Sequence, residues 1–351
     1  MKSLVIYFSQ TGNTKKIGQA IAEGIRSRTG QCDVKRLQDV KGEDWLDYDL
    51  VGIGSCTWSS CPNTRLLYHI KELPEAVKGK HAFFYLTHGC TPGRALSRGV
   101  KPLQEKGLVV LGWKSWYCQA SLPGHFKPWF TDGHPDEHDL DAAYAFGRAM
   151  AEHSERVAKG HPECVPTLPS DQTFDEIYGV GHPFLFKEPP PRMNEGKDIA
   201  EAERQEYILE WPTTMNYVCE LEGIPNIEGY HEGDFHINPD KCIHCHRCVQ
   251  ACWCNNIDGS AEVPRFRSTI CEMCLFCEGV CPTGALEFTF RPPMTEEAAA
   301  MQREKGGGDL AGQLYLAEAM GMFRRYVDLE DIGYTTPWEV ATTHPRHKEI
   351  P

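Results

Sequence analysis

The stretch SLVIYFSQTGNTKKIGQAIAEGIRSR, residues 3–28, changes its pattern once along its length and so decides the fold of the first part of the chain. Residues 3–8 form a short apolar run, which predicts a buried strand. After the loop that follows, the apolar residues take helical spacing, with Ile17, Ile21 and Ile25 four positions apart. The stretch therefore predicts a strand, a loop and a helix in that order.

The same alternation of strand and helix continues to residue 158. Strand-like runs lie at 32–37, 49–55, 81–89 and 108–118, and helical patterns lie at 62–73, 95–106 and 139–158. Five strands joined by crossover helices predict an α/β fold with a doubly wound, five-stranded parallel sheet. In such a sheet, ligands bind at the carboxyl ends of the strands.

The loop Ser9–Thr14, with the sequence SQTGNT, connects the first predicted strand to the first predicted helix. Amide N–H groups at a helix N-terminus, together with the helix dipole, favour a bound phosphate. The hydroxyls of Ser9, Thr11 and Thr14 offer further donors to the phosphate oxygens. The alternative interpretation of these six residues is a capped turn without a ligand.

Residues 1–158 resemble the flavodoxin family, whose phosphate loop follows the pattern Ser/Thr-x-Thr-Gly-x-Thr; SQTGNT matches it at every fixed position. The resemblance implies a flavodoxin-like domain that binds FMN. The chain resembles the short-chain flavodoxins more than the long-chain ones, because no insertion splits the fifth predicted strand. In flavodoxins the loops after the third and fourth strands flank the flavin ring, and here these loops are residues 55–63 and 87–95.

Several residues of these three loops are therefore predicted to contact FMN. Trp58 is the candidate for stacking on the flavin ring, with a tryptophan that caps the sheet edge as the alternative. Glycines at positions 89 and 93 allow a close approach of the backbone and a low-cost change of peptide orientation. The full predicted set is Ser9, Gln10, Thr11, Gly12, Asn13, Thr14, Thr57, Trp58, Ser59, Thr87, His88, Gly89 and Gly93.

Charge and composition restrict where the protein works. The net charge of −13 excludes nucleic acid as an expected partner but allows docking to a basic protein surface. The apolar start is too short for a secretory signal, and no apolar run approaches the length that spans a membrane. We therefore expect a cytoplasmic protein, in which the 16 cysteines do not form a disulfide framework and at least some of them serve metal ligation or redox chemistry.

The cysteines after residue 240 form an internal repeat. Those at 242, 245, 248 and 252 are each followed 29 residues later by a counterpart, at 271, 274, 277 and 281, so that C-x2-C-x2-C-x3-C occurs twice. In this pattern three thiolates hold one cluster, and the fourth, expected at the head of the following helix, reaches the other cluster. The predicted ligands are Cys242, Cys245, Cys248 and Cys281 for one [4Fe–4S] cluster, and Cys271, Cys274, Cys277 and Cys252 for the other. Zinc is the disfavoured alternative, because zinc sites pair two C-x2-C halves and do not need the other cysteines.

Residues 234–290 resemble bacterial two-cluster ferredoxins, and CEMCLFCEGVCPTGALEF is an intact example of their motif. The first half departs from it, because Trp253 replaces the usual proline and Cys254 adds a thiol. We expect a shifted reduction potential for the cluster bound by Cys252, and Cys254 is the alternative ligand. Four more cysteines (Cys56, Cys61, Cys90 and Cys118) fall near the flavin-side loops, where ordinary buried thiols are favoured over a redox disulfide or a metal site.

The remaining segments are a turn-rich stretch with a helix candidate at 196–209 and a C-terminal part that ends in TTPWEVATTHPRHKEIP. The expected layout is a flavodoxin-like domain at 1–158, a linker or docking segment at 159–233, a two-cluster ferredoxin-like domain at 234–290 and a C-terminal helical extension and tail at 291–351. We expect the linker and tail to dock on a protein redox partner.

Together, these parts resemble flavodoxin–ferredoxin fusion proteins of anaerobes. FMN exchanges two electrons together or singly, and each cluster exchanges one, so the chain is predicted to carry electrons at low potential within a larger anaerobic oxidoreductase complex. The alternative hypothesis is a free-standing iron–sulfur flavoprotein reductase that oxidises NAD(P)H or reduces a quinone or another small acceptor. No G-x-G-x-x-G follows a predicted strand, so a nicotinamide site in a Rossmann domain of its own is not indicated.

Overall fold

The computed structural model of the protein describes residues 1–58, 60–120, 129–178, 234–252, 255–267 and 276–289, together with 314, 317, 318 and 320–327. Contacts divide these residues into two units. The first unit holds the described residues up to 178 and those from 314 onward, and the second holds the described residues from 234 to 289.

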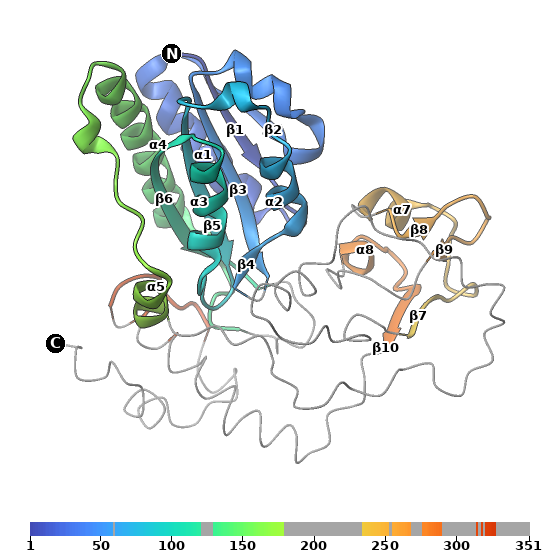
Figure 1. Ribbon diagram of the computed structural model, residues 1–351. Coiled ribbons are helices and arrows are strands. Elements are labelled where there is room, and N and C mark those ends of the chain that lie inside the picture. The colour runs from blue at the N-terminus through green and yellow to red at the C-terminus, as the bar shows by residue number, and fades with distance from the viewer. Residues whose placement is uncertain are drawn as a thin grey trace. The chain divides into compact units, whose positions relative to one another are not determined.

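The first unit is a parallel sheet between two layers of helices (Figure 1). Its main strands are β1 (Ser3–Tyr7), β2 (Asp33–Arg36), β3 (Leu50–Trp58), β5 (His81–His88) and β6 (Val109–Tyr117). They pair in parallel in the order β2-β1-β3-β5-β6, and the short β4 (Cys61–Pro62) turns back to pair with the end of β3. The predicted doubly wound five-stranded sheet is confirmed.

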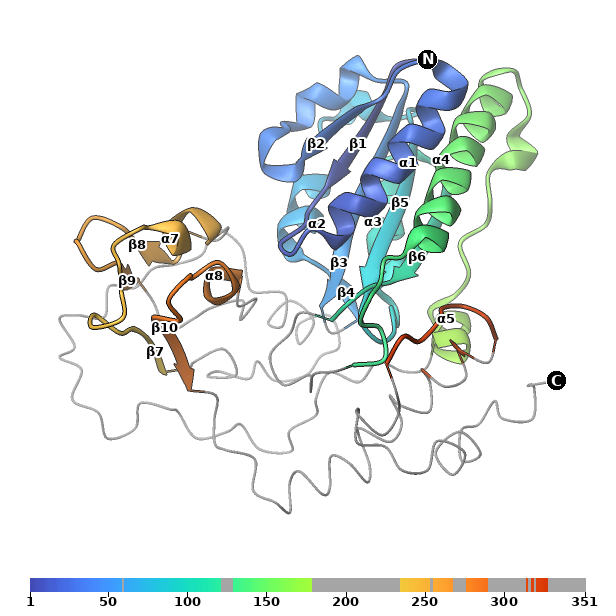
Figure 2. The ribbon, with the colours of Figure 1, turned by 180° about the vertical axis from the view of Figure 1, so that it is seen from behind.

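Helices α1 (Asn13–Thr29) and α4 (Glu137–Ala158) cover one face of this sheet, and α2 (Thr64–Lys71) and α3 (Ala95–Glu105) cover the other, as the two opposite views show (Figures 1 and 2). A further helix, α5 (Asp171–Tyr178), follows in the segment where the sequence predicts the linker. Short 3₁₀ turns complete the unit: η1 (Leu37–Asp39), η2 (Gly42–Asp47), η3 (Glu75–Val77) and η4 (Pro162–Cys164).

The packing of α1 on the sheet shows why residues 3–28 fold as a strand, a loop and a helix. Ile17, Ile21 and Ile25 are fully buried, and each such side chain contributes about 1.5–3 kcal/mol relative to exposure. Helices α1 and α4 meet at two glycines. A Cβ on Gly24 or on Gly147 would lie 2.0 Å from a carbonyl oxygen of the opposite helix, so a larger residue at either position would push the helices apart.

The second unit is small and consists of short elements. Strands β7 (Asp234–Ile237) and β10 (Leu286–Thr289) pair antiparallel, as do β8 (Ile257–Asp258) and β9 (Arg265–Phe266), and two short helices, α7 (Arg247–Ala251) and α8 (Phe276–Gly279), accompany them. Its core combines apolar side chains with five cysteines: Cys242, Cys248, Cys252, Cys277 and Cys281. The predicted α+β character of this part is confirmed.

The first unit includes chain beyond residue 158. Phe323 from the C-terminal part stacks on Tyr117 at the end of β6, with the ring centroids 4.6 Å apart, and Leu314 and Ala317 join the same apolar cluster. Part of the C-terminal extension therefore packs on the protein's own first unit. The predicted helix at 196–209 and the tail after residue 327 lie outside the described residues.

His134 joins helix α4 to this C-terminal segment. Its Nδ1 lies 2.5 Å from a carboxylate oxygen of Asp139, and its Nε2 contacts the backbone carbonyl of Arg324. Both partners are only acceptors, so the protonated ring, in which both nitrogens donate, satisfies both contacts. Burial alone would lower the pKa of His134, but the hydrogen bonds to Asp139 and Arg324, with the charges of Asp139 and Asp136, raise it.

We expect the His134→Gln substitution to destabilise the protein mainly at low pH. A pKa that is raised on folding contributes stability that is complete below the ordinary value of 6.5 and is lost as the pH rises through the raised value. The difference in apparent melting temperature between wild type and variant is therefore larger at about pH 6 than at about pH 8.5. Thermal melts followed by circular dichroism measure it, and an equal difference at both pH values would contradict the protonated ring.

Candidate functional site

Three predicted flavin loops follow strands that run parallel side by side. Strands β1, β3 and β5 are neighbours in the sheet, so the loop Ser9–Asn13, the residues Thr57 and Trp58, and the loop from Thr87 onward lie at the same edge. This is the edge at which open α/β sheets bind ligands. The fold therefore brings the three loops together as the sequence predicts.

The loop after β1 has the geometry of an anion site. Gly12 precedes α1 with φ of +97°, a conformation that glycine adopts without strain, and the first turn of the helix contains no acidic residue. The Ser9 hydroxyl accepts a hydrogen bond from the Gly12 N–H at 3.2 Å and keeps its own hydrogen to donate. The first N–H groups of a helix have no intrahelical acceptors, so this turn suits a phosphate.

A buried contact ties this loop to the end of β5. The hydroxyl oxygens of Thr14 and Thr87 lie 2.8 Å apart, and both side chains are buried. The Asn13 side-chain amide also donates to the Gln119 carbonyl in the loop after β6, at 3.2 Å. The helix start is thus held against the end of β5 and the loop after β6.

Two polar atoms at this edge fit a ligand that is larger than a phosphate. The Gln10 Nε2 and the Thr57 Oγ1 are buried and have no hydrogen-bond partner among the described residues. A buried polar atom without a partner is costly, and a bound polar molecule would remove that cost. The two atoms come from the loops after β1 and β3, so they fit a cofactor that spans both.

Trp58 ends β3 at the turn into β4. It pairs with Cys61 across this short hairpin, and its indole N–H donates to the Cys56 sulfur at 3.2 Å. The indole is therefore held at the edge of the sheet next to the loop, which is compatible with both stacking on a ring and capping the edge. Ser59, predicted to contact FMN, lies outside the described residues.

The loop after β5 is held from several sides. The Gly89 carbonyl accepts hydrogen bonds from the Trp129 indole at 3.2 Å and from the Thr131 hydroxyl at 3.0 Å. These two donors fix the carbonyl, against the expectation that glycine allows the peptide here to reorient at low cost. Gly93, with φ of +49°, packs so closely on Ser60 that a Cβ would lie 2.3 Å from the Ser60 hydroxyl oxygen.

His88 and the four cysteines near the flavin-side loops are shielded from solvent: His88, Cys61 and Cys118 are buried, and Cys56 and Cys90 are partly buried. Burial lowers the pKa of His88 to about 3, and its ring packs edge-on against Tyr117 with the centroids 4.4 Å apart. Burial raises the pKa of the Cys90 thiol to about 12 and that of Cys118 well above its ordinary value. Thiols of this kind are not thiolates at neutral pH, which favours the interpretation as ordinary buried residues.

In the second unit, one cavity brings four predicted cluster ligands together. Cys242, Cys245, Cys248 and Cys281 all line this cavity. Cys281 is distant in sequence from the other three and reaches them only through the fold. Four sulfurs around one cavity, with apolar neighbours such as Ile237 and Leu286, fit a thiolate-bound [4Fe–4S] cluster.

Backbone N–H groups point at the sulfurs. The N–H groups of His244 and Ala285 donate to Cys242 and Cys281, at 3.4 and 3.3 Å. Partial burial opposes ionisation of Cys281, but N–H donors and the Thr283 hydroxyl outweigh it and lower the pKa of this thiol. Such hydrogen bonds stabilise thiolates and adjust the potential of a bound cluster.

The second predicted ligand set is only partly within the described residues. Cys252 accepts a hydrogen bond from the Asn256 N–H at 3.1 Å, and Cys277 is buried in the same core. The predicted ligands Cys271 and Cys274 lie outside the described residues, as do Trp253 and the alternative ligand Cys254.

One expectation about the cysteine motif is wrong. The fourth cysteine of each repeat follows a short helix instead of heading one: Cys252 comes directly after α7, and Cys281 comes after α8. The third cysteines, Cys248 and Cys277, lie inside these helices, so each helix begins within the motif. In the first repeat the reason is that the loop carrying Cys242 and Cys245 turns directly into α7, and Cys252 is reached as that helix ends.

The sequence did not predict the residues that fix the loops after β1 and β5 through hydrogen bonds, because these residues belong to no motif. Gln119 contacts the loop after β1, and Trp129 and Thr131 hold Gly89. Their contacts link positions that are 40 or more residues apart, so no local pattern signals them.

Comparisons with known proteins agree with the two units. Residues 4–107 match the family model for the flavodoxin domain, and residues 235–252 match that for the 4Fe–4S binding domain. A flavodoxin of Aquifex aeolicus (strain VF5) is 44% identical over 178 residues, which span 48% of this chain and 96% of that protein. An NAD(P)H dehydrogenase (quinone) of Archaeoglobus fulgidus is 25% identical over 191 residues, 44% of this chain and 97% of that protein. The solved structure of an archaeal flavodoxin is 23% identical with a TM-score of 0.36, and the match covers 44% of this chain and 99% of that one.

The two family matches imply FMN in the first unit and a 4Fe–4S cluster in the second. Within the part of the chain that the structure describes, no helix is long and apolar enough to cross a membrane.

Proposed function

The chain belongs to the flavodoxin family and also carries a 4Fe–4S ferredoxin-type motif, which makes it an electron-transfer flavoprotein; from this premise we propose that it passes electrons at low potential between FMN and two [4Fe–4S] clusters. FMN exchanges electrons in pairs or singly, whereas a cluster exchanges one at a time. A chain that holds both connects two-electron donors to one-electron acceptors.

The first unit contributes the FMN site of this proposal. The loop Ser9–Thr14 binds the phosphate through the N-terminus of α1, and the two unpartnered atoms, Gln10 Nε2 and Thr57 Oγ1, bind polar groups of the cofactor. Trp58, with the loops 55–63 and 87–95, excludes water from the flavin. Thr14 and Thr87 hold the first and third loops together.

The second unit contributes the cluster ligands. The cavity that gathers Cys242, Cys245, Cys248 and Cys281 is the observation that carries the proposal, since four cysteines converge on one site. The second cluster rests on the 29-residue repeat, which places Cys271, Cys274 and Cys277 with Cys252 in the equivalent roles.

Metal and flavin analysis tests the cofactor content. Protein purified without oxygen is expected to contain about eight irons, about eight sulfides and one FMN per chain. About four irons would leave a single cluster, and eight irons without flavin would remove the FMN part of the proposal.

The partner of this electron carrier is proposed to be a larger anaerobic oxidoreductase complex. We assign this docking to the segments 159–233 and 291–351, apart from α5 and the residues between 314 and 327 that pack on the first unit, and the net charge of −13 suits a basic partner surface. Association that weakens as salt is added would support such docking.

A free-standing reductase is the second candidate. The similarity to an NAD(P)H dehydrogenase (quinone) favours it, although the identity is only 25%. Stopped-flow reduction by NADH, NADPH and reduced ferredoxin separates the two. Rapid flavin reduction by a nicotinamide alone supports the reductase, and rapid reduction only by ferredoxin supports the electron-carrier subunit.

A further inference from the structure

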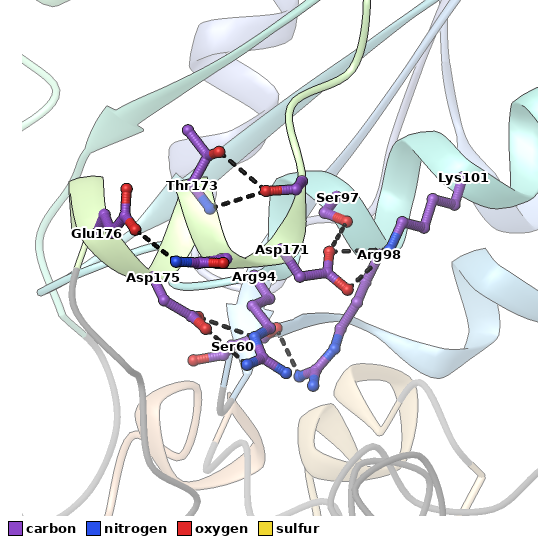
Figure 3. Close-up of polar contacts among 11 residues, drawn as sticks. Ser60, Arg94, Ser97, Arg98, Lys101, Asp171, Thr173, Asp175 and Glu176 are labelled. Atoms are coloured by element: carbon purple, nitrogen blue, oxygen red, sulfur yellow. Dashed lines mark hydrogen bonds and ion pairs between the residues drawn. The ribbon is translucent and has the colours of Figure 1, made fainter.

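Helix α5 lies against the loop that follows β5. This loop, residues 89–94, leads into α3 and is one of the two loops that flank the flavin in flavodoxins, whereas α5 begins 77 residues after the loop ends. Figure 3 shows Asp175 of α5 pointing toward Arg94, and Asp171 of α5 pointing toward Ser97 and Lys101 of α3. No sequence pattern connects the two segments, so their contact is a product of the tertiary structure.

The strongest link is an ion pair between Arg94 and Asp175. Arg94 Nε lies 2.8 Å from one oxygen of the Asp175 carboxylate, and Arg94 Nη2 lies 2.6 Å from the other. The pair is bidentate, and Asp175 is only 16% exposed, so it is partly shielded from solvent. Because Arg94 is the last residue before α3, the pair fixes the end of the flavin-side loop.

A second link holds the middle of the same loop. The Thr91 hydroxyl donates to the carbonyl of Tyr178, the last residue of α5, at 2.7 Å. The same hydroxyl oxygen accepts a hydrogen bond from the Gly93 N–H at 3.3 Å, which closes a small turn inside the loop. Helix α5 therefore contacts the loop at two positions.

The first turn of α5 makes a different contact. Asp171 accepts hydrogen bonds from the Ser97 hydroxyl at 2.5 Å and from Lys101 at 2.8 Å, and both donors lie within α3 rather than in the loop. Phe174 between these contacts is 2% exposed, so the helix also packs through an apolar side chain. One end of α5 thus docks on α3, and the other end holds the loop.

The contacts around α5 and α3 extend to the loop 55–63, the other loop that is predicted to flank the flavin. Arg98, one turn after Arg94, donates to the Ser60 carbonyl at 3.0 Å, and Ser60 touches Gly93. Ser60 has φ of +61°, which is strained for a residue with a side chain and is retained only where the surroundings impose it. The loops 55–63 and 87–95 are therefore joined to each other next to the place where α5 is attached.

We infer that α5 is a positioning element of the FMN site. Asp175 acts through Arg94, and the Tyr178 carbonyl acts through Thr91, to hold residues 91–94 in the conformation that receives the flavin. This inference rests on the proposed FMN binding. A loop that contains glycine loses conformational entropy when it closes on a ligand, and bracing it beforehand reduces that loss and slows release of the ligand.

The rate of FMN release tests the role of Asp175. Holoprotein purified without oxygen is diluted, and the rise in flavin fluorescence gives the dissociation rate. The D175N substitution is expected to raise this rate about tenfold, which corresponds to about 1.4 kcal/mol. The visible circular dichroism of bound FMN, which reports the surroundings of the ring, is expected to change as well.

The matched control is D171N, which removes a carboxylate from the same helix without touching the loop. Its dissociation rate is expected to stay within about twofold of wild type. The charge swap R94D/D175R is expected to bring the rate back toward wild type, and T91V, which lacks the hydroxyl, is expected to raise it independently of the ion pair.

The outcomes separate this inference from the proposed function. Unchanged release in both D175N and T91V, with FMN bound in wild type, would overturn the inference alone. An equal increase of the FMN dissociation rate in D171N and D175N would show that α5 contributes only general packing, and would overturn the role of Asp175. Wild-type protein that binds no FMN would overturn the proposed function and this inference with it.

Discussion

Replacement of Cys281 by alanine is expected to lower the iron content from the proposed value of about eight to about four per chain, because one of the two proposed clusters loses a ligand. Cys281 lines the cavity that also holds Cys242, Cys245 and Cys248, and its sulfur accepts a hydrogen bond from the Ala285 N–H at 3.3 Å. Iron and sulfide analysis of protein purified without oxygen measures the loss. Electron paramagnetic resonance of the reduced protein is expected to show one cluster signal without the coupling between two.

The control for this prediction is Cys164→Ala. Cys164 is a partly buried thiol of the first unit and belongs to neither cysteine repeat, so its loss is expected to leave the iron content unchanged. Full iron content in the C281A protein would contradict the assignment of Cys281. Loss of nearly all iron would mean that the two clusters form only together.

The Thr11→Asp substitution is expected to weaken FMN binding at least about 100-fold. Thr11 is exposed in the loop before α1, and a carboxylate there would stand beside the doubly charged phosphate. Two unit charges 4 Å apart repel by about 1 kcal/mol in water and about 4 kcal/mol near a protein surface, and the second phosphate charge adds to this. Fluorescence titration of the flavin-free protein with FMN measures the affinity.

Thr11→Asn is the matched control, because asparagine has nearly the same shape as aspartate and carries no charge. Its affinity for FMN is expected to remain within about tenfold of wild type, since only one hydroxyl donor is exchanged. Similar losses in both variants would show that the side-chain shape matters and not the charge. Wild-type affinity in T11D would place the phosphate elsewhere.

Local patterns in the sequence were sufficient for the sheet and its helices. The isoleucines at 17, 21 and 25 are fully buried. All five predicted parallel strands, and the predicted helices at 62–73, 95–106 and 139–158, are present with ends that differ by a few residues. These elements are predictable because the spacing of apolar residues differs between a strand and a helix, and a short segment of sequence is enough to show that spacing. Helix α5 is short and follows a turn-rich segment, so its pattern did not distinguish it from the linker.

By itself, the sequence determined the class of the two cofactor sites: SQTGNT predicted the anion loop, and the cysteine register predicted which thiols act together. Only the tertiary structure decided how these residues are held. It placed Cys281 at the cavity of the first three cysteines, paired Thr14 with Thr87, fixed the Gly89 carbonyl, and brought Asp175 to Arg94. A motif consists of residues that are close together in the sequence. A single ion pair or hydrogen bond between distant segments requires no particular sequence pattern in either segment, so only the folded chain reveals it.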